Sequence, residues 1–207
     1  MRYKTTNKLF RGTYQYKIVL VCAGASVFRN NDMEYALKTL GNYDLNSPRS
    51  SINSIRNKDQ LDYAIELANA LSKLDDIEVR VESPWISIYT NYRRHIDTLS
   101  NIDQSKVKYI SLPPDGVSIQ ENTILLPNVD YDYRVTIGRT RHENSAFIQW
   151  AESNSSKVKI TRACKRDLSK DRSWGGSYFY ITGEKLLLVA KMHLGDSISK
   201  IERIIKK

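Results

Sequence analysis

The sequence has little cysteine, no long apolar run and none of the common catalytic motifs. Cys22 and Cys164 are its only cysteines, which excludes a disulfide scaffold and a paired CxxC metal site. The longest uncharged apolar stretch, residues 18–28, is far shorter than the roughly 20 residues of a membrane-spanning helix, so we expect no membrane partner. The patterns GxxxxGK[ST], GxGxxG, HExxH and GxSxG are also missing. We therefore expect no cofactor and no metal site.

The composition is that of a globular protein with a positive charge concentrated in one half. Of 207 residues, 41% are hydrophobic and 27% are charged, which is ordinary for a folded domain. The chain has 32 Lys and Arg against 23 Asp and Glu, a net charge of +9 that favours a polyanionic partner. Residues 116–207 contribute +6 of this charge, with 16 basic and 10 acidic side chains.

The beginning of the chain has two interpretations. Lys4, Lys8 and Arg11 precede the apolar residues 18–25, an arrangement that is similar to a secretory signal peptide. The same apolar residues are typical of a strand that is buried on both faces. We interpret them as a strand and expect a cytoplasmic protein, in a host cytoplasm if the gene belongs to a bacteriophage.

The second half of the chain shows a regular order of alternating and amphipathic segments. Alternation of apolar and polar residues predicts strands, whereas apolar residues three or four apart predict helices. Gly183 and Glu184 begin the second helix, and Gly195 ends it. The predicted strands are 133–139, 157–162, 177–182 and 198–205, and the predicted helices start near Asn144 or Ser145 and at Lys185, with a polar loop after residue 162.

The first half repeats this order with one enlargement. Its predicted strands are 16–21, 77–82, 85–89 and 107–112, with helices that begin at Asn57 and near Tyr92. An additional short helix, 33–41, falls within the enlargement.

Two successive βαββαβ patterns predict an α+β protein with two tandem ferredoxin-like units. The first unit is residues 1–113, with an insertion at about 23–57 after its first strand. Residues 114–128 form a linker marked by two prolines and a glycine, and residues 129–207 form the second unit. The alternative is one α/β domain with a single continuous sheet.

The open face of the second sheet combines cations with aromatic rings. In a βαββαβ unit the helices cover one face, so alternate strand residues point to the other face. The side chains predicted there are Arg134, Thr136, Lys157, Lys159, Thr161, Tyr178 and Tyr180, with Lys200 and Glu202 on the last strand. Residues 176–181 resemble the aromatic strand of RNA-recognition modules, although that signature has a basic residue and a glycine at fixed places that this strand lacks. Tyrosines beside cations are suited to stacking on bases and neutralising phosphates.

The loops of the second unit add further positive charge. Residues 133–172 include ten Lys and Arg against four Asp and Glu. Such a cluster binds phosphates without reading sequence. The candidate nucleic-acid-binding residues are Arg134, Arg139, Arg141, Lys157, Lys159, Arg162, Lys165, Arg166, Tyr178 and Tyr180.

These features predict a non-enzymatic protein that binds RNA or single-stranded DNA through its second unit. The alternative is a phage-type assembly or host-regulatory protein, since the Asn-, Ile-, Lys- and Ser-rich composition is compatible with an AT-rich genome. Protein contact or self-association would then use the first unit, whose open face presents Glu78, Glu82, Trp85 and Tyr89 without an excess of positive charge.

A second alternative is a metal-independent endoribonuclease. Such cleavage needs a general base, a general acid and a cation. His142 within residues 139–143 is the candidate catalytic residue, and the predicted topology places it next to the face that carries Tyr178 and Tyr180. Tandem ferredoxin-like units with basic surfaces are similar to CRISPR-repeat endoribonucleases, but the C-terminal glycine-rich loop of that family is absent, because Trp174–Ser177 precedes the third strand. We interpret Cys22 and Cys164 as small buried apolar residues, although the basic neighbours Arg162, Lys165 and Arg166 would lower the thiol pKa of an accessible Cys164, to which we assign no role.

Overall fold

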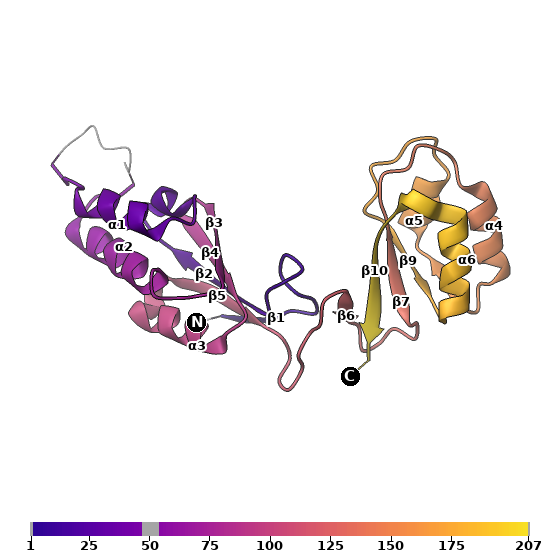
Figure 1. Ribbon diagram of the computed structural model, residues 1–207, viewed down its shortest axis with the longest axis horizontal. Helices are drawn as coiled ribbons and strands as arrows, with labels where there is room; N and C mark the ends of the chain where they lie inside the picture. The colour runs from indigo at the N-terminus through magenta and orange to yellow at the C-terminus, as the bar shows by residue number, and fades with distance from the viewer. Residues whose placement is uncertain (1, 47–53, 207) are drawn as a thin grey trace. The chain divides into compact units, whose positions relative to one another are not determined.

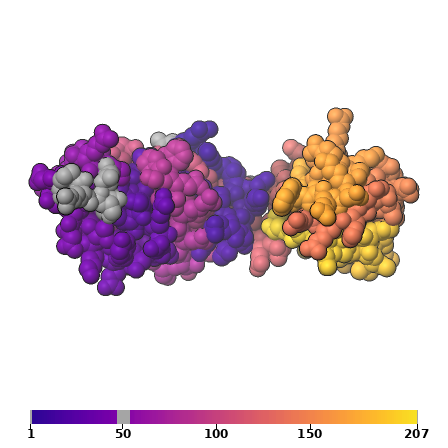
Figure 2. Space-filling model, turned by 90° about the horizontal axis from the view of Figure 1, so that it is seen from above, coloured from indigo at the N-terminus to yellow at the C-terminus, as the bar shows by residue number. Residues whose placement is uncertain are grey.

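The computed structural model describes residues 2–46 and 54–206 and shows a mixed α+β protein. Within these residues there are two five-stranded sheets and six α-helices. The chain divides into two compact units, Met1–Ile119 and Gln120–Lys207. Each unit packs as its own body, coloured indigo to magenta for the first and orange to yellow for the second in Figure 2. The sheets are separate, so the alternative of one continuous sheet is wrong.

Among its described residues, 2–46 and 54–119, the first unit contains three α-helices and one sheet. Its strands are β1 Tyr3–Thr5, β2 Tyr16–Val21, β3 Ile77–Glu82, β4 Trp85–Thr90 and β5 Val107–Leu112. Its helices are α1 Met33–Gly41, α2 Lys58–Leu71 and α3 Arg93–Ile102, with 3-10 segments η1 Ala25–Phe28 and η2 Gln104–Lys106. Part of the predicted insertion, residues 47–53, lies outside the described residues.

The sheet of the first unit has the order β1-β5-β2-β4-β3. The strands β5, β2, β4 and β3 pair antiparallel, and β1 is added in parallel beside β5. The helices begin where the sequence offers N-caps, because the Asn57 carboxamide accepts the Gln60 N–H and the Asp32 carboxylate accepts the Tyr35 N–H. All three helices lie on one side of the sheet (Figure 1).

The second unit has the same plan on a smaller scale. Its strands are β6 Thr123–Leu125, β7 Tyr133–Ile137, β8 Val158–Ile160, β9 Tyr178–Ile181 and β10 Ile198–Ile205. Its helices are α4 Ser145–Ser153, α5 Arg162–Leu168 and α6 Glu184–Leu194, followed by the 3-10 segment η3 Gly195–Ser197. The strand order is β6-β10-β7-β9-β8, in which β6 is parallel to β10 and the other pairs are antiparallel. Figure 1 shows the three helices on one side of the strands.

Each sheet packs one face against the hydrophobic core of its own unit. This face carries the residues that alternation predicts to point inward. In the second unit Val135, Ile137, Phe179 and Ile181 are fully buried against Phe147 and Ala190 of the helices. In the first unit Ile18, Leu20, Ile86 and Ile88 are fully buried against the helices. Residues 18–21 of the apolar stretch thus belong to the strand β2, and Ala25 begins η1. No helix within the described ranges has the length and apolar character needed to cross a membrane.

Four elements differ from the sequence-based prediction. The edge strands β1 and β6 were not expected, and β6 lies within residues 114–128, which were predicted to be a linker. The polar loop after residue 162 is the helix α5, because the Thr161 hydroxyl accepts the Cys164 N–H at 3.2 Å and buries Cys164 one turn from Leu168. The strand β8 is correspondingly shorter than predicted and excludes Lys157 and Thr161.

Candidate nucleic-acid interface

The side of the second sheet that the helices leave uncovered brings tyrosines and cations into cross-strand rows. The strand register places Lys159, Tyr180 and Arg134 opposite one another on β8, β9 and β7. A second row contains Tyr178 on β9, Thr136 on β7 and Lys200 on β10. Because facing side chains in a sheet lie about 5 Å apart, these groups form one surface. We call it the tyrosine face, defined by Tyr131, Arg134, Lys159, Tyr178, Tyr180 and Lys200.

The aromatic rings of the tyrosine face contact one another and a guanidinium. Tyr131, just before β7, stacks on Tyr180 with ring centroids 5.7 Å apart and an interplanar angle of 21°. The Arg134 guanidinium carbon lies 4.1 Å from the Tyr178 ring centroid. Tyr178 and Tyr180 meet edge to face at 5.4 Å. These contacts hold flat groups in fixed orientations on a partly exposed surface.

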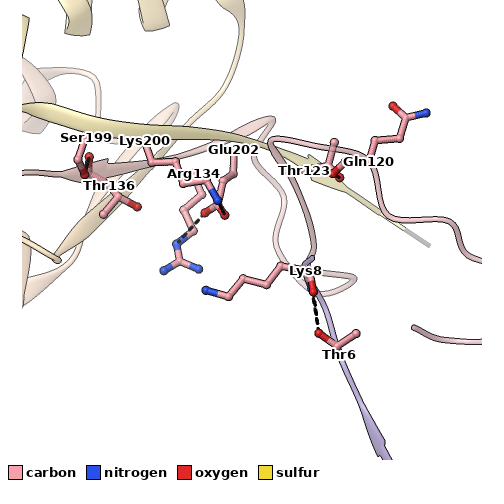
Figure 3. Close-up of polar contacts among 9 residues, drawn as sticks. All are labelled: Thr6, Lys8, Gln120, Thr123, Arg134, Thr136, Ser199, Lys200 and Glu202. Carbon is pink, nitrogen blue, oxygen red and sulfur yellow. Dashed lines mark hydrogen bonds and ion pairs between the residues drawn. The ribbon is translucent and has the colours of Figure 1, made fainter. Parts of the chain in front are cut away.

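One carboxylate lies within this surface. Glu202 on β10 is only 3% exposed, and its Oε1 accepts from the Lys200 ammonium at 2.8 Å. The Arg134 Nε lies 4.0 Å from the second carboxylate oxygen (Figure 3). Glu202 therefore orients two cations of the tyrosine face and offsets part of their charge.

The neighbourhood also changes the acidity of Tyr180. Burial raises the pKa of the Tyr180 hydroxyl, the hydrogen bond and charge of Tyr178 raise it further, and Arg134 opposes them. The hydroxyl consequently remains a neutral hydrogen-bond donor over the physiological pH range.

Other predicted binding residues lie in different places. Arg139, Arg141 and His142 follow β7 and line a groove at the end of the sheet, so the structure separates His142 from the tyrosine face, beside which it was expected. Arg162, Lys165 and Arg166 belong to α5, and the Lys165 ammonium pairs with Glu152 of α4 at 2.5 Å. The helix α5 buries Cys164 and Leu168 in the core, and Arg162, Lys165 and Arg166 are exposed on it rather than on a strand of the sheet. Lys157 precedes β8, where its carbonyl accepts the Thr182 N–H.

Two aromatic residues of this unit, Tyr131 and Trp174, were not among the predicted binding residues. Tyr131 precedes β7 and shows no alternation with it, and only the stack on Tyr180 reveals its place. Trp174 is 87% exposed, with the Arg139 guanidinium carbon 4.9 Å from its ring centroid. The available signal for Trp174 in the sequence was a tryptophan within a polar, basic loop and directly before two glycines, because tryptophan is highly buried on average.

The structure confirms that Cys164 is a buried residue, without the lowered thiol pKa that its basic neighbours would give an accessible thiol. It is fully buried, and burial raises the pKa of its thiol from 9.0 to about 12. The cations of α5 point away from the core that encloses the sulfur, so desolvation decides the protonation state. Both Cys22 and Cys164 behave as small apolar core residues.

The open face of the first sheet carries more positive charge than its sequence indicated. The Lys108 ammonium lies 3.1 Å from the Trp85 ring centroid, and the Lys4 ammonium lies 3.8 Å from that of Tyr109. The edge strand β1, which was not expected, supplies Lys4. Tyr89 on this face is buried beneath Phe10, so it is not available for stacking.

No group of three or more His, Cys, Asp or Glu side chains gathers into a metal-binding arrangement in the part of the chain that the structure describes. Comparison of the sequence and structure with protein-family models, curated proteins and solved structures finds no match.

Proposed function

We propose that each unit is a ferredoxin-like core with one added edge strand. Without β1, the first sheet has the order β5-β2-β4-β3, and without β6 the second has the order β10-β7-β9-β8. Numbered within its unit, each order is fourth, first, third, second, with helices between the first and second and between the third and fourth strands. This arrangement supports the split-βαβ interpretation of both halves.

We further propose that the protein is a non-enzymatic binder of RNA or single-stranded DNA, and that the tyrosine face holds the strand. The observation that carries this proposal is the cross-strand row Lys159, Tyr180 and Arg134 with Tyr178 beside it. Stacking surfaces and cations alternate there at the spacing of neighbouring strands, about 5 Å. Single-stranded nucleic acid needs this combination, because its bases stack on flat side chains while its phosphates require positive charge.

The contacts suggest a division of roles within the tyrosine face. The guanidinium plane of Arg134 over Tyr178 and the ring pair of Tyr131 and Tyr180 offer stacking platforms. Lys159 extends from the outer strand β8, and Lys200 lies near the opposite side of the face on β10. Phosphates on either side of the stacked bases can therefore meet an ammonium group.

A double substitution tests the proposed function. Tyr178→Ala/Tyr180→Ala removes both stacking rings, and we expect the affinity for a fluorescently labelled single-stranded oligonucleotide to fall by at least about 30-fold, because each base stack is worth about 1–3 kcal/mol. Fluorescence anisotropy with RNA, single-stranded DNA and duplex DNA at two salt concentrations gives the measurement. Binding should weaken steeply with salt and favour the single strands.

The matched controls are Tyr35→Ala, an exposed tyrosine of α1, and Arg162→Gln/Arg166→Gln on α5. Tyr35→Ala should leave binding unchanged, and the α5 pair should weaken it about twofold or less, because these exposed arginines lie on a helix and not on a strand of the tyrosine face, and salt screens exposed charges. Binding that is indifferent to salt, or equal in the double mutant and Tyr35→Ala, would contradict the proposal.

One observation supports the alternative of a protein-contact function. Leu188 and Met192 lie one turn apart on α6 and are 61% and 78% exposed. Light scattering distinguishes the two functions, since a monomer that binds oligonucleotides supports the first and a defined oligomer indifferent to them supports the second.

The endoribonuclease alternative depends on His142 and the two arginines beside it. Incubation of the protein with structured RNA in EDTA provides the test. Cleavage by the protein that is lost in His142→Ala would support the endoribonuclease alternative. RNA that stays intact would exclude it.

A further inference from the structure

A groove of about 580 Å³ lies at the end of the second sheet, where the chain leaves β7 and where α6 passes into η3. Its lining includes Arg139, Arg141, His142, Asn144 and Asp196. Small-ligand sites usually have volumes of about 300–1,000 Å³, so this groove has room for one nucleotide.

The polar groups of this groove are those that bind a phosphate and a sugar or base. Arg139 and Arg141 bring two guanidinium groups to one site, and guanidinium matches phosphate oxygens in a bidentate manner. Asp196 and Asn144 provide oxygens that can accept hydrogen bonds from ribose hydroxyls or exocyclic amines.

Trp174 adds an aromatic surface beside the groove. Its ring is 87% exposed, and the Arg139 guanidinium carbon lies 4.9 Å from the ring centroid. Arg139 therefore belongs both to the groove and to the surroundings of the ring. A base stacked on Trp174 would place its own phosphate within reach of these guanidinium groups.

The backbone that carries Trp174 is anchored rather than loose. Thr140 and Ser173 exchange two backbone hydrogen bonds of 3.0 and 3.3 Å, and the Gly176 N–H donates to the Ile137 carbonyl at 2.7 Å. Gly175 packs so closely on β7 that an added Cβ would lie 2.2 Å from the Gly138 carbonyl oxygen. An exposed ring on a fixed backbone loses little entropy when a ligand stacks on it.

We propose that this groove is a nucleotide site in which Arg139 and Arg141 bind a phosphomonoester and Trp174 stacks on the attached base. The phosphomonoester belongs either to the end of a nucleic-acid strand or to a free mononucleotide. A phosphomonoester carries about 1.5 to 2 negative charges near neutral pH, against one for a phosphodiester, and so suits two guanidinium groups better. Recognition of the phosphate at the end of a strand rests on the proposed function, whereas recognition of a free mononucleotide does not.

The test compares ligands that share only part of this chemistry. In isothermal titration calorimetry at low salt, adenosine monophosphate should bind about tenfold tighter than inorganic phosphate, because only the former has a base to stack. In anisotropy competition, a short oligonucleotide with a terminal phosphate should bind about fivefold tighter than the same oligonucleotide without it. Comparison of 5′- and 3′-phosphorylated strands identifies the recognised end.

Variants assign these effects to the groove. Arg139→Gln/Arg141→Gln should abolish the preference for the phosphorylated end, whereas Arg162→Gln/Arg166→Gln, which removes the same charge from α5, should retain it. Trp174→Ala should reduce the affinity for adenosine monophosphate to that for inorganic phosphate, and Trp174→Phe should recover part of the difference.

The outcomes separate this inference from the proposed function. Equal binding of phosphorylated and plain strands, together with adenosine monophosphate no better than inorganic phosphate, would overturn the nucleotide site and leave the tyrosine face untouched. Binding of adenosine monophosphate that needs Arg139, Arg141 and Trp174, with no binding of any oligonucleotide, would support the site for free mononucleotides and overturn the proposed function.

Discussion

At the scale of single residues, Gly175 controls the position of Trp174. Its φ of +77° is a conformation that side chains with a Cβ rarely adopt, and the Gly138 carbonyl oxygen occupies the space of that Cβ. We expect Gly175→Ala to lower the free energy of unfolding by about 2–4 kcal/mol, because backbone strain and the backbone clash add. Urea denaturation followed by circular dichroism measures this change.

Gly176 is the matched control for this prediction. Its φ is +90°, but an added Cβ would meet no atom within 4 Å. Gly176→Ala should therefore cost only the conformational strain, about 1 kcal/mol. Equal losses at the two positions would show that the close approach to β7 has no energetic consequence.

The sequence predicts on which face of a strand a side chain lies, but not which side chains it contacts. Strict alternation predicted that Tyr178 and Tyr180 share one face while Phe179 and Ile181 enter the core, and the burial of the latter two confirms the division. The contacts of Arg134 with Tyr178 and of Tyr131 with Tyr180 were not predictable in the same way. They depend on strand register and on the path of the chain before β7, neither of which a pattern within one segment determines.

At the scale of elements, long periodic segments were predictable and short ones were not. The strands β2, β3, β5 and β10 begin and end where alternation and flanking turn residues indicate. The edge strands β1 and β6 have three residues each, which is too few for a period, and their pairing with β5 and β10 is a tertiary effect.

The helix α5 was missed for a related reason. It has seven residues, and only Cys164 and Leu168 face the core, so its apolar period is not complete. Residues 157–162 also alternate between polar and apolar side chains, so the pattern that predicts the strand β8 extends into the first turn of α5. The sequence therefore predicted Arg162 at the end of a strand and Lys165 and Arg166 in a loop, whereas the structure places all three on α5.

The start of α5 depends on Thr161, which gives an element-scale prediction. The Thr161 hydroxyl accepts the Cys164 N–H at 3.2 Å and donates to the Tyr178 carbonyl at 2.7 Å, so it links α5 to β9. Thr161→Val keeps the shape and removes both hydrogen bonds, and we expect a loss of about 1–2 kcal/mol in the free energy of unfolding. Urea denaturation monitored by tryptophan fluorescence gives the value, since Trp150 packs against the core of this unit.

Thr161→Ser retains the hydroxyl and serves as the control. It should be destabilised by less than about half as much as Thr161→Val, since serine caps helices about as well as threonine. If both variants lost the same stability, the methyl group rather than the hydroxyl would be responsible.

At the scale of the whole molecule, the two units differ in charge and each has its own core. The unit Gln120–Lys207 has 16 Lys and Arg against 10 Asp and Glu, and its buried residues form a separate hydrophobic cluster. A unit with its own sheet and core can fold by itself. The tyrosine face and the groove both belong to this unit.

We therefore predict that a chain shortened to residues 120–207 unfolds in a single cooperative transition and retains the affinity of the whole protein for a single strand within about fivefold. Circular dichroism during urea denaturation and fluorescence anisotropy provide the two measurements. A fragment without a cooperative transition would contradict the independence of its core.

The salt dependence of binding then shows whether the first unit takes part. Each phosphate contact with a single strand contributes about −0.7 to the slope of log affinity against log salt, so the five cations of the tyrosine face and groove predict a slope of about −3.5. The fragment and the whole chain should have the same slope, because the proposed contacts lie in one unit. A slope steeper by about 1.4 in the whole chain would contradict this, because the two cations Lys4 and Lys108, on the open face of the first sheet, would then also contact phosphates. The variant Lys4→Gln/Lys108→Gln distinguishes the two cases, since it returns the slope to that of the fragment only if this second face binds the strand.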